Sequence, residues 1–184
     1  MTATQTSPHE GAEVPDLADL ARVSAELEQE PASSAIKWAW ETFGEGAVLA
    51  ASFQDCVLID IATQAVPEME VVFLDTQYHF AETLWYVDQV RERYDLNVRV
   101  ISPQIAPDNL WQIDPDECCA MRKVEPLARA LDGKSAWLTG LRRDVDEHAV
   151  LERRRQHRAL AERLPRPLDR RRGRLLLELR GDAG

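Results

Sequence analysis

Four short apolar-rich segments, each separated from the next by a stretch with helical periodicity, constrain the fold of this chain more than any other feature. The segments span residues 47–52, 69–74, 97–101 and 136–140. The first is continuously apolar, which is typical of a strand buried on both faces of a parallel sheet. The alternation of strands and helices predicts an α/β fold, a doubly wound parallel sheet with right-handed crossovers.

Helical periodicity and helix-ending residues indicate where the helices begin and end. We expect helices at residues 16–30, 33–43, 56–62, 81–94 and 117–130. Ser33 or Ser34 is suited to cap the second of these, and Gly44 ends it. The last is expected to end near Val124 and to restart at Pro126. The first two helices precede every strand, so we predict that they flank the domain or form a lid.

The composition places the chain among globular proteins with one ordinary domain. It has 184 residues, of which 45% are hydrophobic and 29% charged. No apolar run approaches the roughly 18 residues of a membrane span, and no apolar segment near the start resembles a signal peptide. We therefore expect a cytoplasmic protein with no membrane partner. Its three cysteines, two of them adjacent, are expected to be reduced, metal-bound or redox-active.

The charge changes sign along the chain. Residues 151–184 carry 11 basic and 5 acidic side chains, a net +6, whereas residues 1–150 carry 11 basic and 27 acidic, a net −16. This asymmetry predicts a disordered arm at 1–15, a folded domain at 16–145 and a divergent basic tail at 146–184 that is not native to the fold. A tail that binds RNA or DNA is the alternative. The absence of aromatic residues in the tail and the acidic body argue against a nucleic-acid partner.

Two polar turns follow the first two strands, at the edge where open parallel sheets place ligands. In the first, Ser52 leads through Gln54 and Asp55 into a helix, whose free N–H groups favour a phosphate or sulfate. In the second, Asp75 and Thr76 are placed to meet a ribose or an adenine amino group. For each turn the alternative is an ordinary cap with no ligand.

Adjacent thiols followed by two cations form the sharpest local motif. Cys118 and Cys119 precede Arg122 and Lys123 within about one helical turn, so thiolates are electrostatically supported and an anion can be held beside them. The motif points to sulfur or metal chemistry on an anionic substrate. The alternative is a pair of inward-packing cysteines and two solvent-facing cations.

Four segments, in this order, resemble the phosphoadenylyl-sulfate and adenylyl-sulfate reductase family. They are Ala51-Ser52-Phe53-Gln54-Asp55, Phe73-Leu74-Asp75-Thr76, the run from Cys118 to Leu127, and Leu138-Thr139-Gly140-Leu141-Arg142-Arg143. The resemblance implies a fold of the adenine-nucleotide α-hydrolase-like type. The cysteine pair resembles the branch of the family that carries a [4Fe-4S] cluster and reduces adenylyl sulfate.

The resemblance also implies a reaction and its partners. A thiol attacks the sulfur of adenylyl sulfate and releases AMP, and reduced thioredoxin then frees sulfite, so the family is one of oxidoreductases in sulfate assimilation and cysteine biosynthesis. Reduction of phosphoadenylyl sulfate and an inactive nucleotide-binding module are the alternatives. By resemblance, the site residues are Ser52, Gln54, Asp55, Asp75, Thr76, Lys123, Gly140, Arg142 and Arg143, with Cys118 and Cys119 as metal ligands.

The chain departs from the family pattern beyond Arg143. The second cysteine pair and the nucleophilic cysteine of the family are absent, so only two of four cluster ligands are present and no catalytic residue is assigned. We interpret the chain as a truncated or frame-shifted reductase. A homo-oligomer in which two chains pool their Cys118–Cys119 pairs around one cluster is an alternative. His79 lies beside the Asp75 loop and either touches the ligand or is a solvated loop residue.

Overall fold

A parallel sheet of five strands forms the centre of the molecule in the computed structural model, which describes residues 15–54, 56–140 and 175–178. The strands are β1 (Ala47–Ala50), β2 (Glu70–Leu74), β3 (Val98–Ile101), β4 (Ala136–Thr139) and β5 (Leu175–Glu178). Their spatial order is β3-β2-β1-β4-β5, and each neighbouring pair is parallel. The chain therefore builds outward from β1 to β3 and then crosses back to β4, so the order reverses between β1 and β4.

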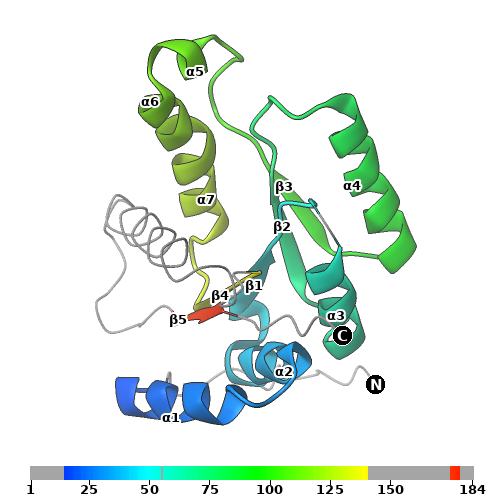
Figure 1. Cartoon of the computed structure of the whole chain (residues 1–184), viewed down its shortest axis with the longest axis vertical. Coiled ribbons are helices and arrows are strands. Elements are labelled where there is room, and N and C mark those ends of the chain that lie inside the picture. Colours follow the sequence, from blue (N-terminus) through cyan, green and yellow to red (C-terminus); the bar gives the residue numbers. More distant parts are fainter. Residues whose placement is uncertain (1–14, 55, 141–174, 179–184) are drawn as a thin grey trace, which may run out of the picture.

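Helices cover both faces of this sheet. They are α1 (Leu17–Leu27), α2 (Ala32–Phe43), α3 (Val57–Ala65), α4 (Ala81–Tyr94), α5 (Leu110–Ile113), α6 (Pro115–Cys119) and α7 (Glu125–Ala130), with a 3₁₀ turn η1 (Gly44–Gly46) and a π-helical turn η2 (Ala120–Val124). Figure 1 shows α6, η2 and α7 as one column on one side of β2 and β3, with α3 and α4 on the other. The predicted doubly wound α/β architecture is confirmed.

The two faces of the sheet pack into two separate hydrophobic cores. Leu49, Val71 and Phe73 pack with α2, α3 and α4 in the larger core. Val48 and Val72, their neighbours along the strands, point to the other face and pack with α7. Because successive side chains alternate across a strand, a continuously apolar run supplies both cores at once. This explains why the predicted strands match the observed ones to within two residues.

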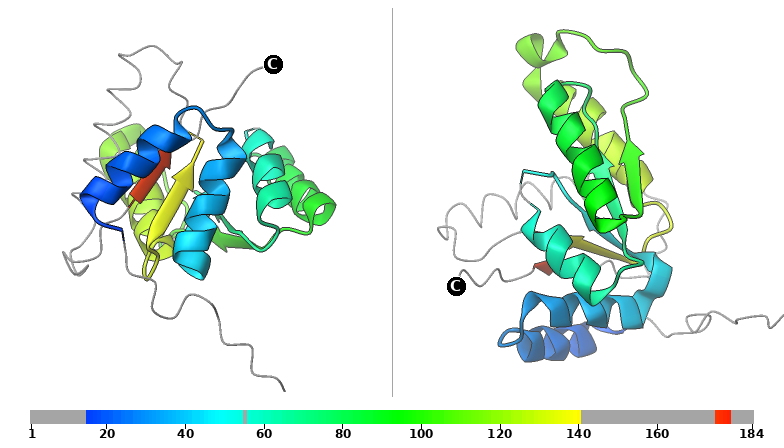
Figure 2. Two further views of the ribbon diagram at one scale, coloured as in Figure 1. Left: turned by 90° about the horizontal axis from the view of Figure 1, so that it is seen from below. Right: turned by 90° about the vertical axis from the view of Figure 1, so that its right-hand side faces the viewer.

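The first two helices flank the sheet as expected, although one detail of the expectation is wrong. Ile36 and Ala39 of α2 are fully buried, whereas α1 buries only Val23. Figure 2 shows this pair of helices at one end of the molecule, away from α5 and α6. Neither serine predicted as a cap, Ser33 or Ser34, serves as one: α2 starts at Ala32 after Pro31, with no side-chain cap. The fixed φ of proline pre-sets the entry into the helix in place of a capping hydroxyl.

The column that carries the cysteines begins earlier than predicted and does not break. Asp114 caps α6 by accepting a hydrogen bond from the Glu117 N–H at 3.0 Å, and Pro115 takes the first helical position. The column then runs through the π-helical turn η2 into α7, which begins at Glu125 with Pro126 in its first turn, within one residue of the predicted restart but without a gap in the column. A π-helical turn adds a residue to one turn and re-aims the side chains that follow, and such turns are frequent at functional sites.

The strand β5 comes from the arginine-rich segment that the charge pattern separates from the domain. Leu175–Glu178 pairs in parallel with β4, with Leu176 opposite Trp137. The rest of residues 146–184, like the N-terminal arm at 1–14, lies outside the described residues, so the predicted division of the chain stays a prediction. In the part of the chain that the structure describes, no helix combines the length and apolarity needed to cross a membrane.

Candidate functional site

The predicted site residues lie at the carboxyl ends of the central strands. Ser52 follows β1 by two residues, Asp75 directly follows β2, and Gly140 directly follows β4. In the register of the sheet Leu49 pairs with both Val71 and Leu138, so these three strands end at similar heights. The topology therefore gathers Ser52, Asp75 and Gly140 at one edge, on either side of the point where the strand order reverses.

The turn after β1 is anchored by a buried aromatic side chain in an unusual backbone conformation. Phe53 is 3% exposed, has φ 56°, and packs edge to face on Phe73 of β2 with ring centroids 5.3 Å apart. A left-handed φ is rare for a bulky residue and persists only where packing enforces it. Its neighbours Ser52 and Gln54 are both exposed. Asp55, predicted beside them, lies outside the described residues.

The turn after β2 is closed by its own side chains. Asp75 Oδ1 accepts a hydrogen bond from the Gln77 N–H at 2.9 Å, and Thr76 Oγ1 accepts one from the Tyr78 N–H at 3.4 Å. Gln77 has φ 67°, so this turn also contains a strained residue. Asp75 therefore caps the turn, which is the alternative role that the sequence left open for it. The turn bond uses only Oδ1 of Asp75, and no hydrogen bond to its second carboxylate oxygen is seen among the described residues.

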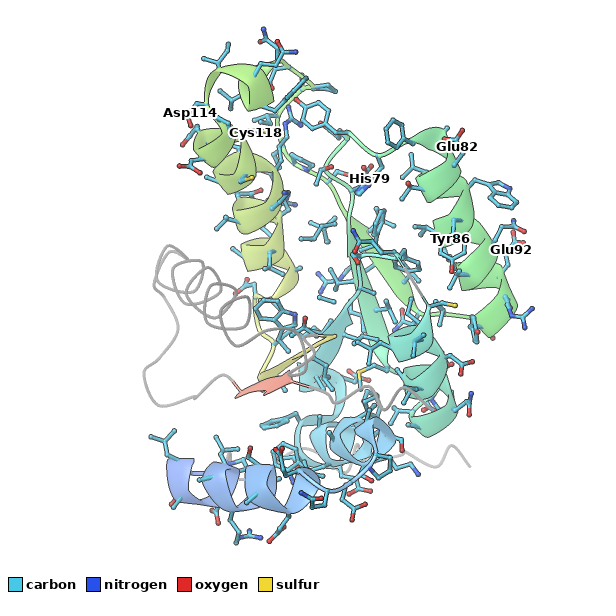
Figure 3. The ribbon with its side chains drawn as sticks, viewed as in Figure 1. His79, Glu82, Tyr86, Glu92, Asp114 and Cys118 are labelled. Carbon is cyan, nitrogen blue, oxygen red and sulfur yellow. The ribbon has the colours of Figure 1, made fainter. Side chains whose placement is uncertain are left out.

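His79 is held by the strand end rather than free in a loop. Its Nε2 lies 3.1 Å from the carbonyl oxygen of Leu74, and its ring lies 5.1 Å from that of Phe73. Figure 3 labels His79 near the end of β2 and Cys118 on the helical column opposite. The imidazole therefore supports the edge where the nucleotide is predicted, and its contact with a ligand stays a prediction.

The four residues of the cysteine motif divide between two environments. Cys118 and Arg122, four residues apart, are 7% and 1% exposed, whereas Cys119 and Lys123 are both exposed. Residues four apart lie on the same side of a helix, so one thiol and one cation face inward and one of each faces solvent. The two cysteines are therefore chemically distinct, and of the two cations only Lys123 is open to a ligand.

Arg122 has a role that the sequence analysis, which grouped it with Lys123 as a cation beside the thiols, did not foresee. Its guanidinium donates to Gln77 Oε1 at 2.9 Å and to the Ala106 carbonyl at 2.7 Å, and it lies 4.5 Å from the centroid of the Tyr78 ring. It also pairs with Asp108 at 3.3 Å. The Leu110 N–H, with Tyr78 and Arg122, holds the pKa of Asp108 below its ordinary value. Helical spacing could have indicated that Arg122 and Lys123 face different ways, but nothing in the sequence identifies the partners of Arg122.

The last predicted segment, residues 138–143, is described only as far as Gly140. Gly140 is exposed, and a Cβ built on it would lie 3.3 Å from Cδ2 of Leu58 on α3. Glycine therefore allows β4 and α3 to approach closely beside the β1 turn. Arg142 and Arg143, predicted to project to the same edge, lie outside the described residues.

Comparisons with known proteins identify the family. The model of the phosphoadenosine phosphosulfate reductase domain matches residues 47–163, which include β1 to β4 and both polar turns. The chain belongs to this family. The match extends beyond residue 145, where the sequence analysis ends the domain.

Curated relatives of this chain are adenosine 5'-phosphosulfate reductases from several bacteria. The adenosine 5'-phosphosulfate reductases of Mycobacteroides abscessus and Mycolicibacterium smegmatis are 43% and 42% identical to this chain, over 66% and 78% of its length. That of Streptomyces coelicolor is 43% identical over 68%. The matched part spans 55%, 62% and 57% of these three relatives, so the chain covers a little more than half of their length.

The fold of the family is also seen in a solved structure. The crystal structure of phosphoadenylyl-sulfate reductase from Candida auris superposes with a TM-score of 0.64, covering 73% of this chain and 72% of that one at 23% identity. The predicted fold, of the adenine-nucleotide α-hydrolase-like type, is confirmed.

A four-iron cluster does not fit the described residues of this phosphoadenosine phosphosulfate reductase domain. Such a cluster takes about four thiolates. Cys118 and Cys119 provide two, and the third cysteine, Cys56, lies at the start of α3. Within residues 15–54, 56–140 and 175–178 no group of three or more cysteine, histidine or acidic side chains is placed to hold a metal ion. No reaction step is therefore derived through a cluster.

Proposed function

We propose that this chain is the nucleotide-binding part of a thioredoxin-dependent reductase that converts adenylyl sulfate to sulfite and AMP. The observation that carries the proposal is the gathering of Ser52, Asp75 and Gly140 at the strand ends beside the reversal of strand order, inside the segment that matches the family. Open parallel sheets bind ligands at this position.

Each residue at this edge has a role suited to its environment. Ser52 and Gln54 are exposed on a rigid turn, and with Asp55 they bind the phosphosulfate. Asp75 and Thr76 bind the nucleoside, using the carboxylate oxygen that the turn leaves open. Lys123 is exposed on η2 and neutralises the sulfate, together with Arg142 and Arg143. Gly140, at the end of β4, meets the nucleoside through its backbone, and its lack of a side chain lets β4 approach Leu58 of α3 closely.

The complete reaction needs a nucleophilic cysteine thiolate. None of the site residues named for this chain supplies it. A cysteine sulfur bonds to the sulfate sulfur, the S–O bond to phosphate breaks, and AMP leaves with the electron pair. A thioredoxin thiolate then attacks the cysteine sulfur, sulfite departs, and the resulting disulfide is reduced by the second thioredoxin thiol. The chain's own contribution is to orient the nucleotide and offset charge on the departing phosphate.

The adjacent cysteines favour adenylyl sulfate over its 3′-phosphorylated relative as the substrate. The three bacterial relatives are named adenosine 5'-phosphosulfate reductases. In the proposed complete protein, Cys118 and Cys119 would supply two cluster ligands, and the remaining ligands would come from a part of that protein beyond these 184 residues or from a second copy in a homo-oligomer. Three unpaired thiols are consistent with the proposed reducing, cytoplasmic setting.

Titration of the 184-residue chain with AMP and with adenylyl sulfate, followed by calorimetry, tests the nucleotide-binding part of the proposal. We expect micromolar to millimolar binding of both and weaker binding of GMP, with adenylyl sulfate the tighter ligand. A folded chain with no affinity for any adenylate would contradict the proposal. Sulfite release with thioredoxin and reductant, measured on the chain alone and joined to the C-terminal part of a relative, tests the reductase activity.

A nucleotide-binding module without catalysis is the second candidate. It is favoured by one observation, the absence of the family's nucleophilic cysteine from the sequence. Adenylate binding by the chain with no sulfite release, and no recovery of activity in the joined protein, would support it over the reductase.

A further inference from the structure

Arg122 is buried, although the next residue in the chain, Lys123, is exposed. Within residues 15–54 and 56–140 it is the one charged or polar residue that is buried, at 1% exposure. Burying a cation carries a large desolvation cost unless hydrogen bonds and a counter-charge compensate. Here the compensation is incomplete, because the Nε atom is buried with no hydrogen-bond partner.

The contacts of Arg122 join two loops that come from different strands. From the turn after β2 it contacts the Thr76 carbonyl at 3.4 Å, the Gln77 side chain and the Tyr78 ring. From the segment after β3 it contacts the Ala106 carbonyl and the Asp108 carboxylate. A planar guanidinium with several fixed donors can hold such a set of partners at once.

The two loops are also joined directly, next to the guanidinium. The Tyr78 hydroxyl donates to the Asp108 carbonyl at 2.6 Å and lies 3.0 Å from Oδ1 of the same residue. Asp108 in turn accepts from the Leu110 N–H at 3.0 Å, at the start of α5. Arg122, Tyr78 and Asp108 therefore form one unit, which we call the arginine latch.

The latch restrains the strained residue of the nucleotide turn. Gln77, at φ 67°, is held from two sides, by Arg122 on its side chain and by Asp75 on its N–H. A left-handed residue that is not glycine relaxes unless its surroundings hold it. If Gln77 relaxes, the bond that orients the Asp75 carboxylate is lost.

We propose that Arg122 is a positioning residue, which holds the Asp75–Tyr78 turn in the conformation that binds the nucleotide. The proposal rests on the proposed function for its ligand. It assigns the two cations of the motif different tasks: Lys123 faces the substrate, and Arg122 shapes the loop that receives it.

Replacement by an apolar side chain of similar length separates positioning from folding. If Arg122 only stabilises the fold, Arg122→Met lowers the free energy of unfolding. AMP binding then falls only because a larger fraction of the chain is unfolded. Removing one partner of an ion pair is costly when it leaves the other charge buried, but Asp108 is 39% exposed and remains solvated in the variant. For a positioning residue we expect Arg122→Met to melt within about 5 °C of the wild type.

Two readouts on the full chain test the proposal. By calorimetry, we expect the Kd for AMP to rise at least about tenfold in Arg122→Met. By hydrogen exchange without ligand, we expect the amides of residues 76–78 and 106–110 to exchange at least about tenfold faster, with the strands unchanged. A folded variant that keeps the wild-type Kd, or the wild-type exchange in both loops, would overturn the proposal.

Arg129→Met is the matched control. Arg129 lies in the same helical column and donates to Glu125 at 2.6 Å and to the carbonyl of Ser102, the first residue after β3, at 2.6 Å, but none of its described hydrogen bonds reaches residues 76–78 or 106–110. We expect its Kd for AMP to stay within about twofold of the wild type. An equal loss of AMP affinity in Arg129→Met would mean that removing any arginine contact of the helical column weakens AMP binding. That result would overturn the assignment to Arg122.

A second variant is needed in case Arg122→Met does not fold. Arg122→Lys keeps the charge but has a single ammonium, which cannot reach partners in both loops with the same geometry. We expect an intermediate loss of AMP affinity and faster exchange in the loop that the ammonium releases. If neither variant folds, Arg122 is a folding residue and the proposal is wrong. If the wild type binds no adenylate, the proposed function fails, and exchange alone then decides whether Arg122 orders the turn.

Discussion

The rings of Phe53 and Phe73 meet edge to face, with centroids 5.3 Å apart, and join the turn after β1 to the middle of the sheet. Both side chains are almost completely buried, at 3% and 2% exposure. The polar turn that is proposed to bind phosphosulfate is therefore an extension of the hydrophobic core. Its position is set by aromatic packing rather than by the polar residues on either side.

Phe53→Ala is expected to lower the free energy of unfolding by about 3–5 kcal/mol, because it leaves a cavity against Phe73. Urea denaturation measures the change. Phe80→Ala is the control: Phe80 is 79% exposed, so its loss should cost no more than about 0.5 kcal/mol. Equal effects of the two substitutions would show that Phe53 does not occupy the core.

Glu70 is expected to make stability depend on pH. Burial by itself raises the pKa of Glu70, but the hydrogen bonds from Lys134, at 2.6 Å, and from Arg99 outweigh burial and hold the pKa below its ordinary value. The ionised form is therefore favoured by folding. Its stabilisation is present above the unfolded pKa, near 4.3, and is lost as pH falls through the lower folded pKa.

Glu70→Gln tests this dependence. At pH 7 we expect the variant to be less stable by about 1–2 kcal/mol, and we expect the gap to narrow as pH falls below the unfolded pKa, near 4.3, and through the lower folded pKa of Glu70. Urea denaturation from pH 3 to pH 8 measures the gap. A gap that stays constant across this range would mean that the ionised Glu70 does not contribute.

Cys119 is expected to react with iodoacetamide in the folded protein well before Cys118 does. Cys119 is exposed, whereas Cys118 is 7% exposed and reacts only when the column opens. Peptide mass spectrometry over a time course gives both rates, and we expect them to differ by about tenfold or more. Cys119→Ser should remove the fast phase, and comparable rates in the wild type would contradict the two environments.

Lys123→Ala is expected to weaken adenylyl sulfate binding about tenfold, because one charge-assisted hydrogen bond to the sulfate is lost. AMP lacks the sulfate, so its Kd should change less. Melting temperature should not change, because Lys123 is exposed. Lys37→Ala, which removes an exposed cation from α2 at the far end of the molecule, is the control. An equal loss for AMP and adenylyl sulfate would place Lys123 away from the sulfate.

The sequence alone determined the architecture, because the signals that specify it are local. The apolar runs at Val48–Leu49 and Val71–Phe73 identify strands buried on both faces, and the helical stretches between them make the strands parallel. Asp75 and Gly140 follow their strands directly, so their place at the carboxyl edge follows from the topology without any side-chain geometry. A turn role for Asp75 could also be foreseen, since aspartate often bonds to a nearby backbone N–H.

Only the tertiary structure decided which side chains of the motifs are open to a ligand. Arg122 and Lys123 are adjacent cations of similar local context, and their separation into a buried latch and an exposed cation depends on the π-helical turn and on two loops far away in sequence. In the same way, β5 joins the sheet from a segment whose charge suggested a separate tail, because the edge of β4 offers it backbone partners. Local sequence sets the strands and helices, whereas long-range packing decides what each exposed or buried residue does.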